Sequence, residues 1–145
     1  MMSENNPLVI GCVEADNPTW TKIQKLISAP QFEPGSGIEF VANVSFLARP
    51  EYQKLTPQKV VEALPESYEP RFVFVVDSVT LQSEAHPILV IGFDSDSERN
   101  VDIRTFRALP STIQSIENNL SIGNMDFQDF ANNTDSEGIF RGFPS

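Results

Sequence analysis

The chain has 145 residues, the length of a single domain, and carries a formal net charge of −10 from 20 acidic and 10 basic residues. It contains no cluster of Lys or Arg that could neutralise phosphates, so we expect neither a nucleic acid nor an anionic membrane surface as a partner. No stretch approaches the roughly 20 apolar residues of a membrane span, and the N-terminus has no positively charged leader, so we expect a cytoplasmic protein. A basic protein would be attracted, although the same charge also keeps a protein in solution.

Three segments in the first half of the chain predict β-strands. Residues 8–13 form a short continuous apolar run, which is typical of a strand buried on both faces. Residues 38–46 alternate apolar and polar side chains and predict a half-buried strand. Residues 71–77 are β-branched or aromatic between two charged ends, so we expect them to form the central strand of the sheet.

Capping residues and helical periodicity predict helices between these strands. Asp16 or Asn17 can cap a helix whose first turn contains Pro18, and apolar residues then recur at helical spacing as far as Ile27. Thr56, which a proline follows, opens a second short helix by the same arrangement.

The second half predicts a hairpin followed by two helices. Residues 88–93 and 101–109 are strands separated by a polar loop, and the charged residues of the second strand indicate an edge of the sheet. Ser111 and Gln114 have the spacing of a capping box for a third helix. Asn124 is expected to cap a short fourth helix.

The order of these elements predicts an α/β fold. Strands alternate with helices in the first half, which favours parallel pairing, and the hairpin adds an antiparallel edge. We expect a three-layer sandwich with a mixed, mainly parallel five-stranded sheet and about four short helices. No linker or repeat divides the sequence, so residues 1–145 are expected to form one domain, with 1–7 and 144–145 flexible.

Three carboxylates are predicted to meet at one edge of the sheet. Glu14 and Asp16 follow the first strand and Asp77 follows the third, and open α/β sheets bind ligands beyond the carboxyl ends of their strands. These acids could hold Mg²⁺, and their layout resembles that of phosphoacceptor receiver domains, although the lysine that such domains place after a later strand is missing. Turn and cap roles are the alternative, and for Asp16 the nearby Pro18 favours a helix cap.

The sequence contains neither a complete nucleophile system nor a complete calcium loop. Cys12, the single cysteine, lies within an apolar strand, and His86, the single histidine, precedes a proline in a connector. Residues 94–98 begin like a calcium loop, but Arg99 stands where glycine is needed and Thr105 where glutamate is needed. We therefore expect a solvated hairpin loop there and no catalytic residues.

A non-catalytic, acidic protein-binding module is the leading hypothesis, in an immunity-like or regulatory role that neutralises a basic partner. The candidate binding residues are acids expected to be exposed in the hairpin loop and the C-terminal helix: Asp94, Asp96, Glu98, Asp126 and Asp129. One alternative is a Mg²⁺-dependent enzyme or phosphoacceptor that uses Glu14, Asp16 and Asp77, and another is a structural subunit of a larger assembly. No cofactor is expected, except Mg²⁺ under the first alternative.

One segment of the chain resembles a known family. Residues 115–127 have the sequence Ser-Ile-Glu-Asn-Asn-Leu-Ser-Ile-Gly-Asn-Met-Asp-Phe. With the strand end at 75–77 and the tail 138–143, this segment resembles an uncharacterised bacterial family described only as a domain of unknown function. The resemblance covers residues 8–143 and implies a small stand-alone bacterial protein without a known activity, so it carries over no functional residues.

Asn118, Asn119, Ser121 and Asn124 surround one helix junction within that segment. Amides and hydroxyls satisfy the free backbone groups of helix ends, and we favour this role. The same side chains could also line a polar pocket.

Overall fold

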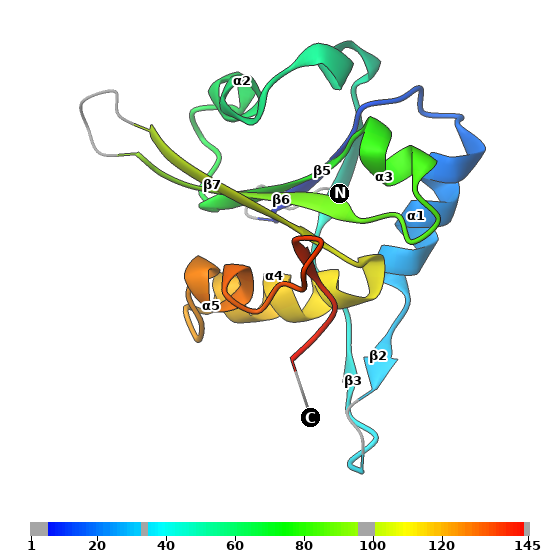
Figure 1. Ribbon diagram of the computed structural model, residues 1–145, viewed down its shortest axis with the longest axis vertical. Coiled ribbons are helices and arrows are strands. Elements are labelled where there is room, and N and C mark those ends of the chain that lie inside the picture. Colours follow the sequence, from blue (N-terminus) through cyan, green and yellow to red (C-terminus); the bar gives the residue numbers. More distant parts are fainter. Residues whose placement is uncertain (1–5, 33–34, 96–100, 144–145) are drawn as a thin grey trace.

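Among the described residues, a sheet of six strands runs through the centre of the protein with helices on both faces (Figure 1). The computed structural model describes residues 6–32, 35–95 and 101–143. The strands lie in the order β4-β1-β5-β6-β7-β8 and span Ser45–Ala48, Leu8–Gly11, Phe72–Val76, Ile88–Ser95, Val101–Ala108 and Ile139–Phe140. The pairs β1–β4, β1–β5 and β7–β8 are parallel, whereas β6 is antiparallel to both of its neighbours.

The helices form the two outer layers of a three-layer sandwich. α1, α4 and α5 pack on one face of the sheet, and α2 with the 3-10 helix η1 packs on the other (Figure 1). Their bounds are α1 Pro18–Ser28, η1 Pro50–Lys54, α2 Pro57–Ala63, α3 Ser78–Gln82, η2 Pro110–Thr112, α4 Ile113–Ser121 and α5 Phe127–Ala131. No helix in the described ranges is both long enough and apolar enough to cross a membrane.

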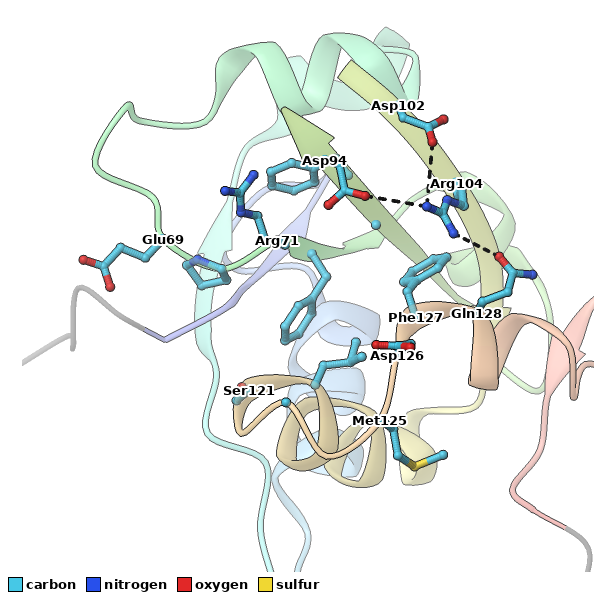
Figure 2. A pocket seen from close by; sticks show the side chains of 16 residues that line it. Glu69, Arg71, Asp94, Asp102, Arg104, Ser121, Met125, Asp126, Phe127 and Gln128 are labelled. Atoms are coloured by element: carbon cyan, nitrogen blue, oxygen red, sulfur yellow. Dashed lines mark hydrogen bonds and ion pairs between the residues drawn. The ribbon is translucent and has the colours of Figure 1, made fainter. Parts of the chain in front are cut away.

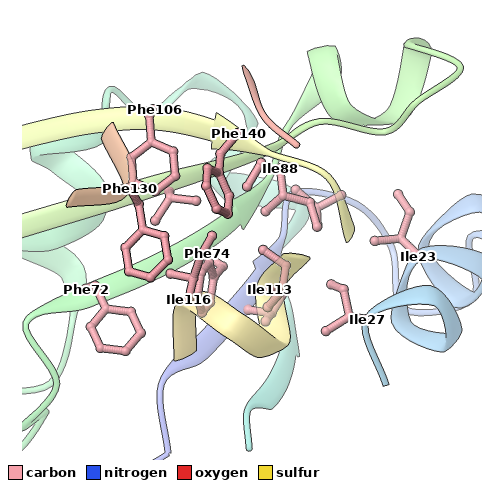
Figure 3. Packing of buried hydrophobic residues seen from close by; sticks show 14 of the residues in the cluster. Ile23, Ile27, Phe72, Phe74, Ile88, Phe106, Ile113, Ile116, Phe130 and Phe140 are labelled. Atoms are coloured by element: carbon pink, nitrogen blue, oxygen red, sulfur yellow. The ribbon is translucent and has the colours of Figure 1, made fainter. Parts of the chain in front are cut away.

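β5 is buried on both faces, and its alternating side chains divide the core in two. Phe72, Phe74 and Val76 face the layer of α1, α4 and α5, which Figure 3 shows packed with aromatic and isoleucine side chains. Val73 and Val75 face α2. This arrangement explains the absence of a polar face in the sequence of this strand, and its predicted central position is confirmed.

The first helices begin where the sequence predicts. Asn17 caps α1, with its Oδ1 accepting from the backbone nitrogens of Thr19 at 2.9 Å and Trp20 at 3.2 Å. Thr56 caps α2, with its Oγ1 accepting from the Lys59 nitrogen at 3.2 Å.

The alternating segment 38–46 is not one strand. β4 begins at Ser45, while Glu39–Phe40 forms a separate strand, β3, that pairs antiparallel with β2 (Gln31–Phe32) in a ribbon projecting from the body (Figure 1). Only the later part of the alternating segment contributes side chains to the core: Val44 and Phe46 pack against the core, whereas Ile38 is 53% exposed. Periodicity alone cannot tell a strand that reaches the core from one that leaves it.

The C-terminal segment supplies a sixth strand that the sequence analysis missed. Ile139 and Phe140 pair in parallel with Arg107 and Ala108, so β7, expected at the edge of the sheet, is covered at its end. The fully buried Phe140 ring holds this strand, with its centroid 5.3 Å from that of Phe130. Two residues are too few to produce a pattern, so this pairing depends on a tertiary contact.

The helices of the second half begin differently from the prediction. The 3-10 turn η2 precedes α4, whose cap is Thr112, and the expected capping box of Ser111 and Gln114 is not formed. Asp126 rather than Asn124 caps α5. With α3, in the connector after β5, the described residues contain five α-helices where about four were expected.

The termini expected to be flexible fall mostly outside the described residues. Pro7 is within them and is buried, and its carbonyl accepts a hydrogen bond from the Ser45 nitrogen at 3.0 Å.

Val75→Asp is expected to prevent folding, because the side chain of Val75 is only 2% exposed between β5 and α2 and a charge placed there has no partner. An unpaired buried charge costs several kcal/mol, comparable with the whole stability of roughly 5–15 kcal/mol of a domain. Val79→Asp is the matched control. Because Val79 is 45% exposed on α3, this substitution should leave the melting temperature nearly unchanged. Circular dichroism measures both, and a Val75→Asp variant with a native melting temperature would contradict the packing described.

Candidate functional site

An ion pair occupies the edge of the sheet where the sequence predicted a carboxylate cluster. β1 and β5 are parallel neighbours, as predicted, and Asp77 directly follows β5. The Asp77 oxygens accept hydrogen bonds from Arg107 Nη1 at 3.0 Å and Nη2 at 2.8 Å, which makes the pair bidentate. Arg107 Nη1 also donates to the Pro87 carbonyl at 3.1 Å, so the guanidinium joins the start of β6 to the end of β5.

Glu14, Asp16 and Asp77 do not converge on a metal site. Glu14 and Asp16 are exposed in the turn between β1 and α1, whereas Asp77 is partly buried against Arg107. In the described parts of the chain, no group of three or more His, Cys, Asp or Glu side chains could hold a metal ion. The guanidinium of Arg107 supplies the positive charge that a cation would have supplied, and it comes from a strand 30 residues away in sequence.

The contact with Arg107 also determines the ionisation of Asp77. Burial raises the pKa of this carboxyl, but the hydrogen bonds from Arg107 and Thr80, with the positive charge of Arg107, outweigh it and hold the pKa below the ordinary value of 3.8. Asp77 also caps α3, because its Oδ1 accepts from the Thr80 nitrogen at 3.1 Å. The contacts of this carboxylate are therefore those of a structural residue.

Cys12 and His86 lie in the packed core at this end of the sheet. Burial, with a contribution from the charge of Asp77, raises the pKa of the Cys12 thiol to about 11, so the thiol stays protonated at neutral pH. His86 is buried with a φ of 51°, and its Nδ1 lies 2.9 Å from the carbonyl oxygen of Thr80. Thr80 Oγ1 in turn donates to the Pro87 carbonyl at 2.8 Å. These contacts fix the connector between α3 and β6.

A pocket of about 710 Å³ lies at the opposite edge of the sheet, and we call it the Phe127 pocket (Figure 2). The start of β5, the end of β6, the start of β7 and the α4–α5 junction surround it. Phe127 forms one wall and lies directly over Gly92, where a Cβ atom would come within 2.5 Å of the ring. The absence of a side chain at Gly92 therefore lets the aromatic ring lie against β6.

Both apolar and charged side chains line the Phe127 pocket. Four of the lining residues are acids and two are bases: Glu69, Asp94, Asp102, Asp126, Arg71 and Arg104. Arg104 Nη2 lies 3.6 Å from Asp94 and 3.7 Å from Asp102, and its Nη1 donates to the Gln128 amide oxygen at 3.2 Å (Figure 2). The acids around the pocket thus exceed the bases.

Two of the predicted binding acids lie at this pocket. Asp94 and Asp126 line it and are exposed. Asp129 does not line it and instead accepts a hydrogen bond from the Asp126 nitrogen at 2.9 Å, as part of the start of α5. Asp96 and Glu98 lie outside the described residues. Arg104 and Phe127 were missed as site residues, because only the approach of the hairpin to α5 makes them neighbours.

A second pocket, of about 640 Å³, lies between the β2–β3 ribbon and α4, and we call it the Glu117 pocket. Asn118, Asn119 and Ser121 line it, as the polar-pocket alternative predicted. Their side chains donate to the Val41 carbonyl, the Ser115 carbonyl and the Glu117 carboxylate, and not to the free carbonyls at the end of α4, which was the role we favoured. Glu117, a residue that the sequence analysis did not single out, lines the pocket with a side chain only 3% exposed.

Comparison with known proteins agrees with the resemblance noted in residues 115–127. A family model described as a domain of unknown function (DUF6924) matches residues 6–143. No curated protein matches the sequence.

Arg107→Gln is expected to destabilise the protein by roughly 2 kcal/mol at neutral pH, because it leaves a partly buried carboxylate without its charged donor. The pKa of Asp77 is lowered in the folded state, so its contribution is present above the unfolded-state pKa and is lost as the pH falls through the folded-state value. The difference in free energy of unfolding between wild type and variant should therefore shrink below about pH 4. Urea unfolding from pH 7 to pH 3 measures this difference.

Arg104→Gln is the control on the same strand. Its side chain is 46% exposed and its carboxylate partners lie at 3.6 and 3.7 Å, so the loss should stay below about 1 kcal/mol. Equal losses of unfolding free energy in the two variants at every pH would show that the Asp77–Arg107 pair stabilises the fold no more than the exposed contacts of Arg104.

Proposed function

We propose that this chain, which belongs to the DUF6924 family, is a non-catalytic protein-binding module that holds a basic segment of a partner protein in the Phe127 pocket. The observation that carries the proposal is the acidic surround of an aromatic pocket in a chain of net charge −10. In this role the protein is regulatory or immunity-like, covering a basic site on its partner.

The two kinds of lining residue have different parts in this binding. Burial of apolar side chains against Phe127 and its neighbours supplies affinity, as in the centre of most protein interfaces. The exposed carboxylates of Asp94 and Asp126 attract a cationic partner before contact and exclude acidic ones. Arg104 offsets part of the negative charge of Asp94 and Asp102, and these three groups together keep a net charge of −1.

Selection of peptides tests this proposal. Random peptides displayed on phage are selected for binding to three proteins: the wild type, the pocket variant Asp94→Asn/Asp126→Asn and the control variant Glu62→Gln/Glu84→Gln. Both variants lose two exposed negative charges, but Glu62 and Glu84 do not line the pocket. We expect wild type and control to enrich peptides with Lys or Arg beside an apolar residue, and the pocket variant to lose that enrichment. Peptides without basic residues, or the same enrichment in all three selections, would contradict the proposal.

The association rate of a selected peptide then tests for electrostatic steering. We expect the Asp94→Asn/Asp126→Asn variant to associate roughly threefold to tenfold more slowly at low salt and to depend less on salt concentration. The Debye length falls from about 30 Å at 0.01 M salt to about 8 Å at 0.15 M. The association rates of wild type and variant should therefore converge at 0.15 M. Stopped-flow fluorescence measures both, and an association rate that does not change with salt would exclude steering.

The structural-subunit hypothesis differs from this proposal in its expected oligomeric state. Apolar side chains are exposed on and beside the β2–β3 ribbon, among them Phe32 at 65% and Ile38 at 53%. A module that acts alone should scatter light as a monomer of 16.2 kDa. A stable oligomer dispersed by Phe32→Ser would favour the subunit hypothesis instead.

A further inference from the structure

The Glu117 pocket contains a buried carboxylate whose protein contacts are all neutral. Glu117 Oε1 accepts from the Asn43 backbone nitrogen at 2.6 Å and from the Asn118 amide at 2.8 Å, and Oε2 accepts from the Ser121 hydroxyl at 2.7 Å. Within the described residues, no Lys or Arg lies within ion-pair distance of it, and it is the one charged residue that lines the pocket. A carboxylate offers about four acceptor sites, so three bonds leave one for a ligand.

Each of three amides around Glu117 donates at least one hydrogen bond to the protein. Gln31 donates to the Ala29 carbonyl at 3.1 Å and Gln114 to Asn118 Oδ1 at 3.0 Å. Asn118 uses both of its N–H groups, on the Val41 carbonyl at 3.0 Å and on Glu117. Within the described residues, Gln31 and Gln114 each keep a carbonyl oxygen and one N–H group for a ligand, so the charge of Glu117 is what gives the pocket its preference for a cation.

Aromatic rings stand at the same pocket. Phe32 on β2 and Phe40 on β3 both line it and are 65% and 38% exposed. The face of a phenyl ring attracts a cation within about 6 Å, and more strongly where water is excluded. The volume of about 640 Å³ lies within the range of pockets that hold small ligands.

We propose that the Glu117 pocket binds an organic cation, an ammonium or guanidinium group, with Glu117 as its counter-charge. Such a group brings a positive charge with three to five donors, which matches a pocket whose one charged lining residue among those described is the carboxylate of Glu117. A neutral sugar or an acid lacks this match, because the first brings no charge and the second repels Glu117. This site shares Ser121 with the Phe127 pocket, but the proposal does not depend on the function proposed for that pocket.

Titration of the ¹⁵N-labelled protein with simple probes tests the proposal. The probes are n-butylammonium and methylguanidinium, each compared with its neutral counterpart, 1-butanol and methylurea, in phosphate buffer free of amines. We expect saturable shifts of the Asn43, Asn118 and Ser121 amide signals with the cations, and at least tenfold weaker binding of the neutral probes. Equal binding of a cation and its neutral counterpart, or no saturation with either cation, overturns the proposal.

Variants separate binding from a structural role of Glu117. Glu117→Gln can keep the network, because its amide oxygen can accept from Asn43 while its amide nitrogen donates to Ser121. It should weaken cation binding at least tenfold, whereas the control Glu84→Gln, outside the pocket, should not change it. Phe40→Ala should weaken binding severalfold while leaving the buried carboxylate in place. Unchanged affinity in a folded Glu117→Gln variant overturns the proposal, and if that variant does not fold, unchanged affinity in Phe40→Ala does so.

The same titration distinguishes the two sources of such a group. Spermidine represents a free amine, and N-acetyl-lysine-N-methylamide represents a lysine side chain in a protein. Preference for the capped lysine assigns the pocket to a protein partner, and preference for spermidine assigns it to a small molecule. Binding of neither overturns the proposal.

Discussion

Burial of β5 on both faces is the constraint on which the rest of the structure depends. All five of its residues are buried, so the strand needs a neighbour on each side within the sheet and a layer of helices on each face. β1 and β6 supply the neighbours, and the helices divide between the two faces because Phe74 and Val75 point in opposite directions. The three-layer sandwich is the consequence.

The two ends of the sheet differ in whether side chains fill the space beyond β5 or leave a pocket there. At one end, Arg107 reaches over the start of β6 to Asp77, and the ion pair fills the edge that parallel strands usually leave to ligands. At the other end, β5 pairs with β6 only as far as Gly92, while β6 and β7 stay paired out to Ser95 and Val101. The hairpin therefore extends beyond β5, and the Phe127 pocket lies between it and the α4–α5 junction.

Local signals predicted much of the fold, and contacts distant in sequence decided the rest. Asn17 and Thr56 begin helices through bonds to residues two or three positions away, and such caps can be recognised in a sequence. Arg107 and Phe140 act through partners on other elements, so neither the closed carboxyl edge nor the sixth strand could be predicted. The exposed acids Asp94 and Asp126 were predicted as a consequence of composition, without the pocket that brings them together.

The charges of the chain are unevenly distributed, and this distinguishes the two pockets physically. From Ser111 to Met125 the sequence contains one charged residue, Glu117, and that residue is buried. The acids at the Phe127 pocket are exposed to water, so salt screens their attraction for a cation. Glu117 is shielded from solvent, and its attraction for a cation is screened much less. Both proposals assign cationic ligands to these pockets. In them, the acids at the Phe127 pocket act mainly on the rate of encounter, and Glu117 acts on the stability of the bound state, since a buried pair must be separated before the ligand leaves.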